Sequence, residues 1–67
     1  MPSEPELQAQ DVELLRLLAG GLVTPAVARR LNASERTVRR RMRAVCEQVG
    51  VGTPIEAVVW AVRPGLL

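Results

Sequence analysis

The chain has 67 residues and a net charge of +2, with 48% apolar residues but no phenylalanine, tyrosine or histidine. The usual general bases and activated nucleophiles are nearly absent, because all nine basic residues are arginine, so we expect a binding module rather than an enzyme. The single cysteine, Cys46, cannot form an internal disulfide, and without histidine we expect neither a metal site nor another cofactor.

The apolar residues are too dispersed to form a membrane span. No apolar run approaches the ~20 residues needed to cross a bilayer, and the start of the chain, MPSEPE, is acidic and lacks the basic and apolar regions of a secretion signal. A lone cysteine fits a reducing compartment. We therefore expect a cytoplasmic protein with no membrane partner, whose small aliphatic core suits a few short helices better than a sandwich of strands.

The pattern of apolar, capping and turn residues predicts an all-α fold of four helices. Leucines at helical spacing indicate the first helix, which Gly20 and Gly21 are expected to end. Thr24 and Pro25 are expected at the cap and the first position of the second helix. The predicted ranges are about 8–19, 25–31, 35–49 and 54–63, in one domain of residues 7–67 that follows a flexible leader of residues 1–6.

The second and third helices are joined by a tight turn and form a helix-turn-helix unit. Asn32 lies in this turn, and asparagine is the residue that best tolerates a positive φ after glycine. Ser34 is expected to cap the third helix. Ala28 is small where the two helices cross, and Val38 would anchor the third helix on the second. The third helix is expected to bury a stripe formed by Val38, Met42, Val45 and Val49.

The fourth helix begins with a capping box, from Thr53 to Glu56, and is apolar nearly all round. One face is expected to pack inward: Ile55, Val58, Val59 and Val62. The other apolar residues are expected at an interface: Ala57, Trp60 and Ala61. A helix that is apolar on several sides needs a second surface to cover it. We favour a homodimer contact; the alternatives are docking on a domain absent from this chain and a purely internal role.

Positive charge is concentrated around the third helix. Residues 29–43 carry seven arginines against one acid, Glu35, whereas the segments on either side are net acidic. Such a concentration indicates a polyanionic partner, and arginine binds phosphate and guanine in planar, bidentate fashion. The alternatives are a solvated basic face without a partner, and a basic amphipathic helix that binds an anionic membrane or a protein groove.

Three stretches of the chain resemble the LuxR-type family of bacterial transcription regulators: LLRLLAGGL, VARRLNASERTVRRRMRAV and GVGTPIEAVVWAV. The family's TV(K/R) motif is Thr37-Val38-Arg39 here, and its LGV-x-x-x-x-EA segment runs from Val49 to Ala57. The resemblance covers roughly residues 7–67. It implies a DNA-binding domain whose third helix enters the major groove of double-stranded DNA and whose fourth helix forms a two-fold dimer. A sigma-factor region 4-like domain also has a basic helix-turn-helix, but the Gly-Val and Glu-Ala signature argues against it.

The resemblance also suggests roles for individual residues. The base-reading candidates carried over from the family are Arg39, Arg40 and Arg43. We expect phosphate contacts from Ser34, Arg36, Thr37 and Arg41, with Arg29 and Arg30 as further candidates. An arginine that contacts guanine O6 and N7 discriminates by ~1–3 kcal/mol per base, whereas phosphate contacts set the register without reading sequence. Cys46 is expected to be an inert apolar residue.

The chain departs from the family pattern at three places. Gln8 and Ala9 stand where the first helix usually begins with Thr-Pro, Gln48 stands where a lysine often precedes LGV, and Gly52 and Pro54 stand where basic residues are common. Several phosphate contacts are therefore missing, although the additional arginines of the third helix can compensate. We expect a sequence-specific regulator, either alone or with a receiver or ligand-sensing domain; the alternative is a protein-interaction module of the same fold that has lost DNA binding.

Overall fold

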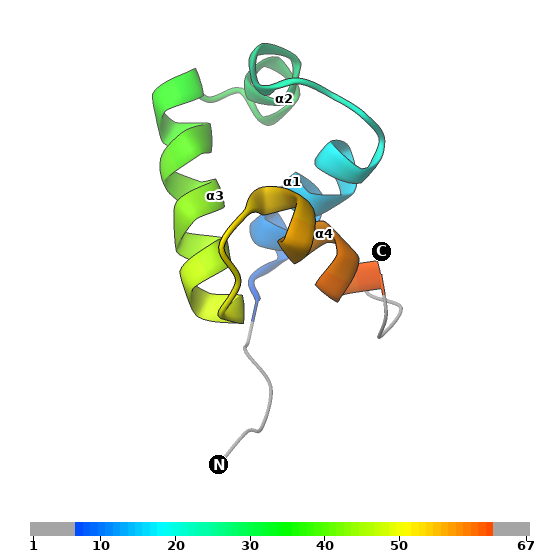
Figure 1. The fold of residues 1–67 in the computed structure, drawn as a ribbon. Helices are drawn as coiled ribbons and strands as arrows, with labels where there is room; N and C mark the ends of the chain where they lie inside the picture. Colours follow the sequence, from blue (N-terminus) through cyan, green and yellow to red (C-terminus); the bar gives the residue numbers. More distant parts are fainter. Residues whose placement is uncertain (1–6, 63–67) are drawn as a thin grey trace.

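The computed structural model describes residues 7–62, which form four α-helices and, within that range, no strand (Figure 1). The helices are α1 (Ala9–Ala19), α2 (Thr24–Leu31), α3 (Glu35–Val49) and α4 (Pro54–Val62). The predicted all-α fold of four helices is therefore confirmed. Two expectations lie outside the described residues: the leader of residues 1–6 and the end of the fourth helix at Arg63.

The core has two parts, and α1 contributes to both through adjacent leucines. One part lies between α1, α2 and α3 and consists of Leu14, Val27, Ala28 and Val38. The other lies between α1, α3 and α4 and consists of Leu15, Val45, Cys46, Ala57, Val58 and Ala61. Neighbouring residues on a helix point about 100° apart, so Leu14 and Leu15 face different neighbours. This arrangement leaves α3 at the edge of the molecule, with one long side free of other helices (Figure 1).

The tight turn between α2 and α3 forms as predicted. Asn32 has a φ of 54°, in the left-handed region. Its N–H donates to the Arg29 carbonyl at 3.2 Å, and the Ala33 N–H donates to the Ala28 carbonyl at 2.9 Å. These two bonds satisfy carbonyls that the end of α2 would otherwise leave unpaired. Because Ala28 and Val38 are buried in the same cluster, the turn holds α3 firmly against α2.

Polar side chains cap two other helices at their start, and a glycine ends a third helix. The Gln8 N–H donates to the Asp11 carboxylate at 3.1 Å, so α1 has a cap although it lacks a Thr-Pro start. At the start of α4 the Glu56 N–H donates to the Thr53 hydroxyl at 3.3 Å, and that hydroxyl donates to the Glu56 carboxylate at 3.1 Å. Gly50 ends α3 with a φ of 86°, which a residue with a Cβ rarely adopts.

The start of α2 differs from the prediction by one residue. Thr24 is the first helical residue rather than the cap; Val23 occupies the cap position, and no side chain there bonds to the helix. The Val27 N–H already donates to the Val23 carbonyl at 3.0 Å, so the helical bonds begin one residue earlier. Pro25 still lies in the first turn, where the N–H that proline lacks has no helical partner to lose.

The predicted faces of α4 are mostly wrong: of the four residues expected to pack inward, only Val58 is buried. Ala57 and Ala61, expected at an interface, are 0% exposed and lie in the chain's own core. Ile55 and Val59, expected to pack inward, are 69% and 52% exposed. The physical reason is the size of the side chains: two alanines one turn apart let α4 approach α1 and α3 closely. Trp60 is half-buried against the edge of the same cluster.

Candidate nucleic-acid interface

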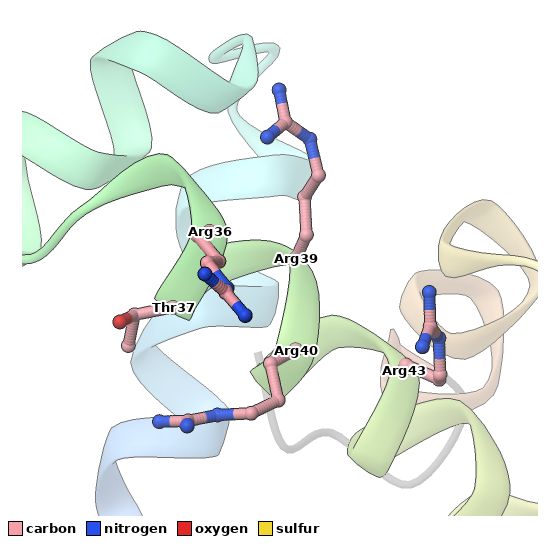
Figure 2. Close-up of a pocket in the computed structure, with 5 residues that line it drawn as sticks. All are labelled: Arg36, Thr37, Arg39, Arg40 and Arg43. Carbon is pink, nitrogen blue, oxygen red and sulfur yellow. The ribbon is translucent and has the colours of Figure 1, made fainter.

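The outer side of α3 carries a dense group of basic side chains (Figure 2). Five residues line a hollow of about 410 Å³: Arg36, Thr37, Arg39, Arg40 and Arg43. All five belong to one helix, so the hollow is a gap between long side chains rather than a cleft between elements. Figure 2 shows these side chains spreading away from α3 in different directions. A surface of this kind can reach several acceptor groups of an extended polyanion at once.

The spacing along α3 explains why these side chains gather. Arg36, Arg40 and Arg43 follow one another at intervals of four and three residues, which places them on one side of a helix. Val38 and Val45 lie on the opposite side and are buried, so packing of the core turns the arginines outward. The predicted grouping of base-reading candidates is therefore reproduced, since Arg39, Arg40 and Arg43 all line the hollow.

The candidates for phosphate contacts are more dispersed. Arg29 and Arg30 are exposed in the last turn of α2, where a cation also interacts favourably with the helix dipole. Arg36 and Thr37 lie on the outer side of α3 with the base-reading candidates. Arg41 is half-buried, and its position next to Arg40 turns it about 100° around the helix from that residue. Arg41 therefore lies on a flank of α3 rather than at the centre of the basic side.

The two hydroxyl candidates at the start of α3 bond to each other. The Ser34 Oγ accepts the Thr37 N–H at 3.1 Å, which is the predicted cap, and the Ser34 hydroxyl donates to the Thr37 Oγ1 at 3.0 Å. This arrangement uses the hydroxyl hydrogen of Ser34 but not that of Thr37. Thr37 also lines the basic hollow, so it is the hydroxyl better placed to donate to a phosphate.

One acidic side chain lies among the arginines, and its contact was missed in the sequence. The Glu35 carboxylate is 3.1 Å from the Arg39 guanidinium, with side chains that are 45% and 61% exposed. The sequence did contain an indication of this contact, because Glu35 and Arg39 are four residues apart, a spacing at which side chains on a helix meet. In the free protein, therefore, one of the three base-reading candidates already has a partner.

A second hollow of about 310 Å³ lies between α3 and the start of α4. Its lining residues are Arg39, Met42, Arg43, Cys46, Gly52 and Pro54. Burial raises the pKa of the Cys46 thiol, and the negative charge of Glu56 raises it further. A buried, protonated thiol is a poor nucleophile and a poor metal ligand. Within residues 7–62 no cluster of three or more potential metal ligands occurs.

Within residues 7–62, three of the four exposed large apolar side chains lie on α4. Ile55 and Val59 are one turn apart on it, and together with Val51, Glu56 and Trp60 they line a shallow hollow of about 320 Å³. Val62, one further turn along, is 55% exposed. These side chains replace Ala57 and Ala61 as candidates for contact with a second molecule. None of the helices within residues 7–62 is long and apolar enough to cross a membrane.

A basic helix that a shorter helix and a tight turn hold at the surface, with arginines along its outer side, defines a helix-turn-helix DNA-binding domain. Comparison with known families makes the assignment specific. The chain belongs to the bacterial regulatory proteins of the luxR family, whose sequence pattern matches residues 6–61. This family consists of DNA-binding regulators of transcription rather than enzymes. The resemblance noted in the sequence is therefore confirmed.

A curated relative supports the same assignment. The chain is similar to the "Transcriptional regulatory protein YdfI" of Bacillus subtilis, with 35% identity over 65 residues. The aligned region covers 97% of this chain but 30% of the relative. The chain therefore spans less than a third of that relative's length, and the similarity concerns the helix-turn-helix region.

Proposed function

We propose that the chain binds a specific sequence of double-stranded DNA in the bacterial cytoplasm, with α3 in the major groove, and so regulates transcription. The observation that carries this proposal is the group of arginines on the free side of α3, which no other helix within residues 7–62 covers. The major groove, about 12 Å wide, admits one α-helix, and arginine is the side chain that most often reads guanine there.

We assign base reading to Arg39, Arg40 and Arg43. Each is exposed on the outer part of α3, and a guanidinium can donate two parallel hydrogen bonds to guanine O6 and N7. Arg36 and Thr37, near the start of α3, are proposed to contact phosphates at the edge of the groove. These contacts would set the depth and direction of α3 without reading bases.

The remaining phosphate contacts are proposed to flank α3. Arg29 and Arg30 would bind the backbone from the end of α2, and Arg41 would bind it from the flank of α3. Ser34 contributes indirectly, since its hydroxyl orients that of Thr37. Such contacts supply affinity that is independent of sequence and that falls steeply as salt rises.

The exposed apolar side of α4 is proposed to form a two-fold homodimer. Three large apolar side chains of α4 are exposed to solvent in the single chain: Ile55, Val59 and Val62. Burying them in an interface would stabilise the assembly. Trp60 lines the same hollow, and aromatic residues are enriched at interface centres. Two copies related by a two-fold axis would place two α3 helices on half-sites about one helical turn apart.

Selection of bound sequences from a random pool of double-stranded DNA tests this function. We expect enrichment of a half-site that contains guanine, repeated at about one helical turn. A titration at rising salt on the selected sequence should show a steep loss of affinity. Absence of enrichment would contradict sequence-specific binding. A partner that the protein retained at high salt would instead favour the alternative of a protein-interaction module of the same fold.

A further inference from the structure

Glu35 is out of place on a helix that is proposed to enter DNA. It is the single acid among residues 29–43, and it lies in the first turn of α3. A carboxylate close to DNA is repelled by the phosphates, so its presence weakens sequence-independent attraction. Its position does favour the helix, since an acid near a helix N-terminus interacts well with the helix dipole. That benefit would be the same for an acid without any partner.

The partner of Glu35 is a proposed base reader. Its carboxylate lies 3.1 Å from a terminal nitrogen of Arg39, and both side chains are about half exposed. An exposed pair of this kind contributes little to folding stability. In the major groove, however, less water would surround the pair, and the attraction between the two groups would strengthen. The contact therefore matters more for the orientation of Arg39 on DNA than for the stability of the free domain.

The chemistry of the guanidinium leaves room for a base. Arginine has five N–H donors in a planar fork, and the contact of Arg39 with Glu35 involves one terminal nitrogen, Nη2. The other donors can still bind guanine O6 and N7. The carboxylate also restricts Arg39, because a guanidinium that turned toward a phosphate would leave Glu35 unpaired beside a like charge.

We infer that Glu35 determines specificity: it holds Arg39 in position to read a base and prevents it from acting as one more phosphate contact. This inference rests on the proposed function, since it needs α3 in the major groove. Glu35 is then a positioning residue that acts through Arg39. Its loss would make binding to DNA stronger in general and less selective at one base pair.

Base preference, measured by selection from a random double-stranded pool, separates these effects. The half-site position that loses its preference in Arg39→Ala identifies the base pair that Arg39 reads. Glu35→Gln removes the charge with little change in shape. Glu47→Gln is the matched control, because Glu47 is exposed near the other end of α3 and its loss changes the net charge equally. Circular dichroism of each variant checks that the helices are intact.

Both substitutions should raise the affinity for random DNA because each removes one negative charge, and Glu35→Gln should raise it more, because it also releases Arg39 to contact a phosphate. At the position read by Arg39, Glu35→Gln should lower the preference for the favoured base by about fivefold, which is within the range that one bidentate contact supplies. Glu47→Gln should leave that preference unchanged. Equal preferences in wild type and Glu35→Gln would overturn the inference while leaving the proposed function intact. No enrichment with the wild-type protein would overturn both.

Discussion

The Ser34 Oγ accepts the Thr37 N–H at 3.1 Å while its own hydroxyl donates to the Thr37 Oγ1 at 3.0 Å. This pair of bonds joins the start of α3 to its basic side. The two residues therefore have different main roles: Ser34 caps the helix and orients the Thr37 hydroxyl, and Thr37 keeps a hydroxyl hydrogen that can bind a phosphate.

The first prediction separates these two roles by substitution. Ser34→Ala should lower the free energy of unfolding by about 1 kcal/mol, the usual effect of losing a cap. Thr37→Val keeps the N–H that Ser34 caps, so the stability should change little, but affinity for DNA of any sequence should fall by about fivefold. Urea unfolding and fluorescence anisotropy measure the two effects. A Thr37→Val protein with unchanged DNA affinity would exclude the proposed hydroxyl contact.

A second prediction concerns the arginines proposed to read bases. Arg39→Ala combined with Arg43→Ala should reduce affinity for the selected sequence by at least about 30-fold, because two bidentate contacts are lost. The helices should be unaffected, since both side chains are exposed. Arg16→Ala is the control, because Arg16 lies on α1 and pairs with Glu13. Normal binding by the double variant would show that the reading face is assigned to the wrong residues.

The turn between α2 and α3 supplies a third prediction. The φ of Asn32 is 54°, a conformation that costs an ordinary L-residue about 1–2 kcal/mol. Asn32→Ala should therefore destabilise the domain by about 1 kcal/mol, whereas Asn32→Gly should be nearly neutral because glycine adopts this conformation freely. Urea unfolding of both variants measures the difference. Equal stabilities would indicate that the left-handed turn is absent in solution.

A fourth prediction tests the homodimer. Val59→Glu would place a charge in the proposed interface, and sedimentation should then show a monomer with intact helices. Because Val59 is 52% exposed in the single chain, the substitution should not unfold it. Val23→Glu is the matched control, because Val23 is 68% exposed at the start of α2, away from the proposed interface. The Val23→Glu protein should remain a dimer. A Val59→Glu protein that remained dimeric would remove α4 from the interface.

The last prediction follows from the raised pKa of Cys46, which burial causes first and Glu56 second. The unfolded thiol titrates near its ordinary value of about 8.5, so above that pH the folded state holds more protons than the unfolded state. The free energy of unfolding should therefore fall as the pH rises from about 8.5 through the folded pKa. Cys46→Ala should show a weaker fall over the same range in urea unfolding at several pH values. Identical pH profiles of wild type and variant would contradict the shift.

Much of this fold follows from local features of the sequence. Asn32 predicted the end of α2, and Ser34 predicted the start of α3. A left-handed turn and a helix cap each depend on one side chain and its nearest backbone groups, so both can be predicted from local sequence. The basic side of α3 was also predictable. Charged residues there alternate with buried valines at helical spacing, so burying Val38 and Val45 leaves one orientation for the arginines.

The contact between Glu35 and Arg39 could not be predicted from the sequence alone. The four-residue spacing permits this contact. However, several arginines lie within reach of the Glu35 carboxylate on the same helix, and which of them pairs with it depends on side-chain rotamers that cannot be predicted from the sequence. The structure selects Arg39. This choice turns an acid that is ordinary at the start of a helix into a candidate determinant of specificity.

By itself, the sequence determined the number of helices, the turn and the basic side of α3, because each depends on interactions within a few residues. The orientation of α4 was decided only by the tertiary structure. That helix is apolar on nearly every side, so its own pattern does not favour one inward face. Packing against Leu15 and Val45 selects Ala57 and Ala61, because small side chains allow the closest approach of helices, and the larger Ile55 and Val59 are left outside.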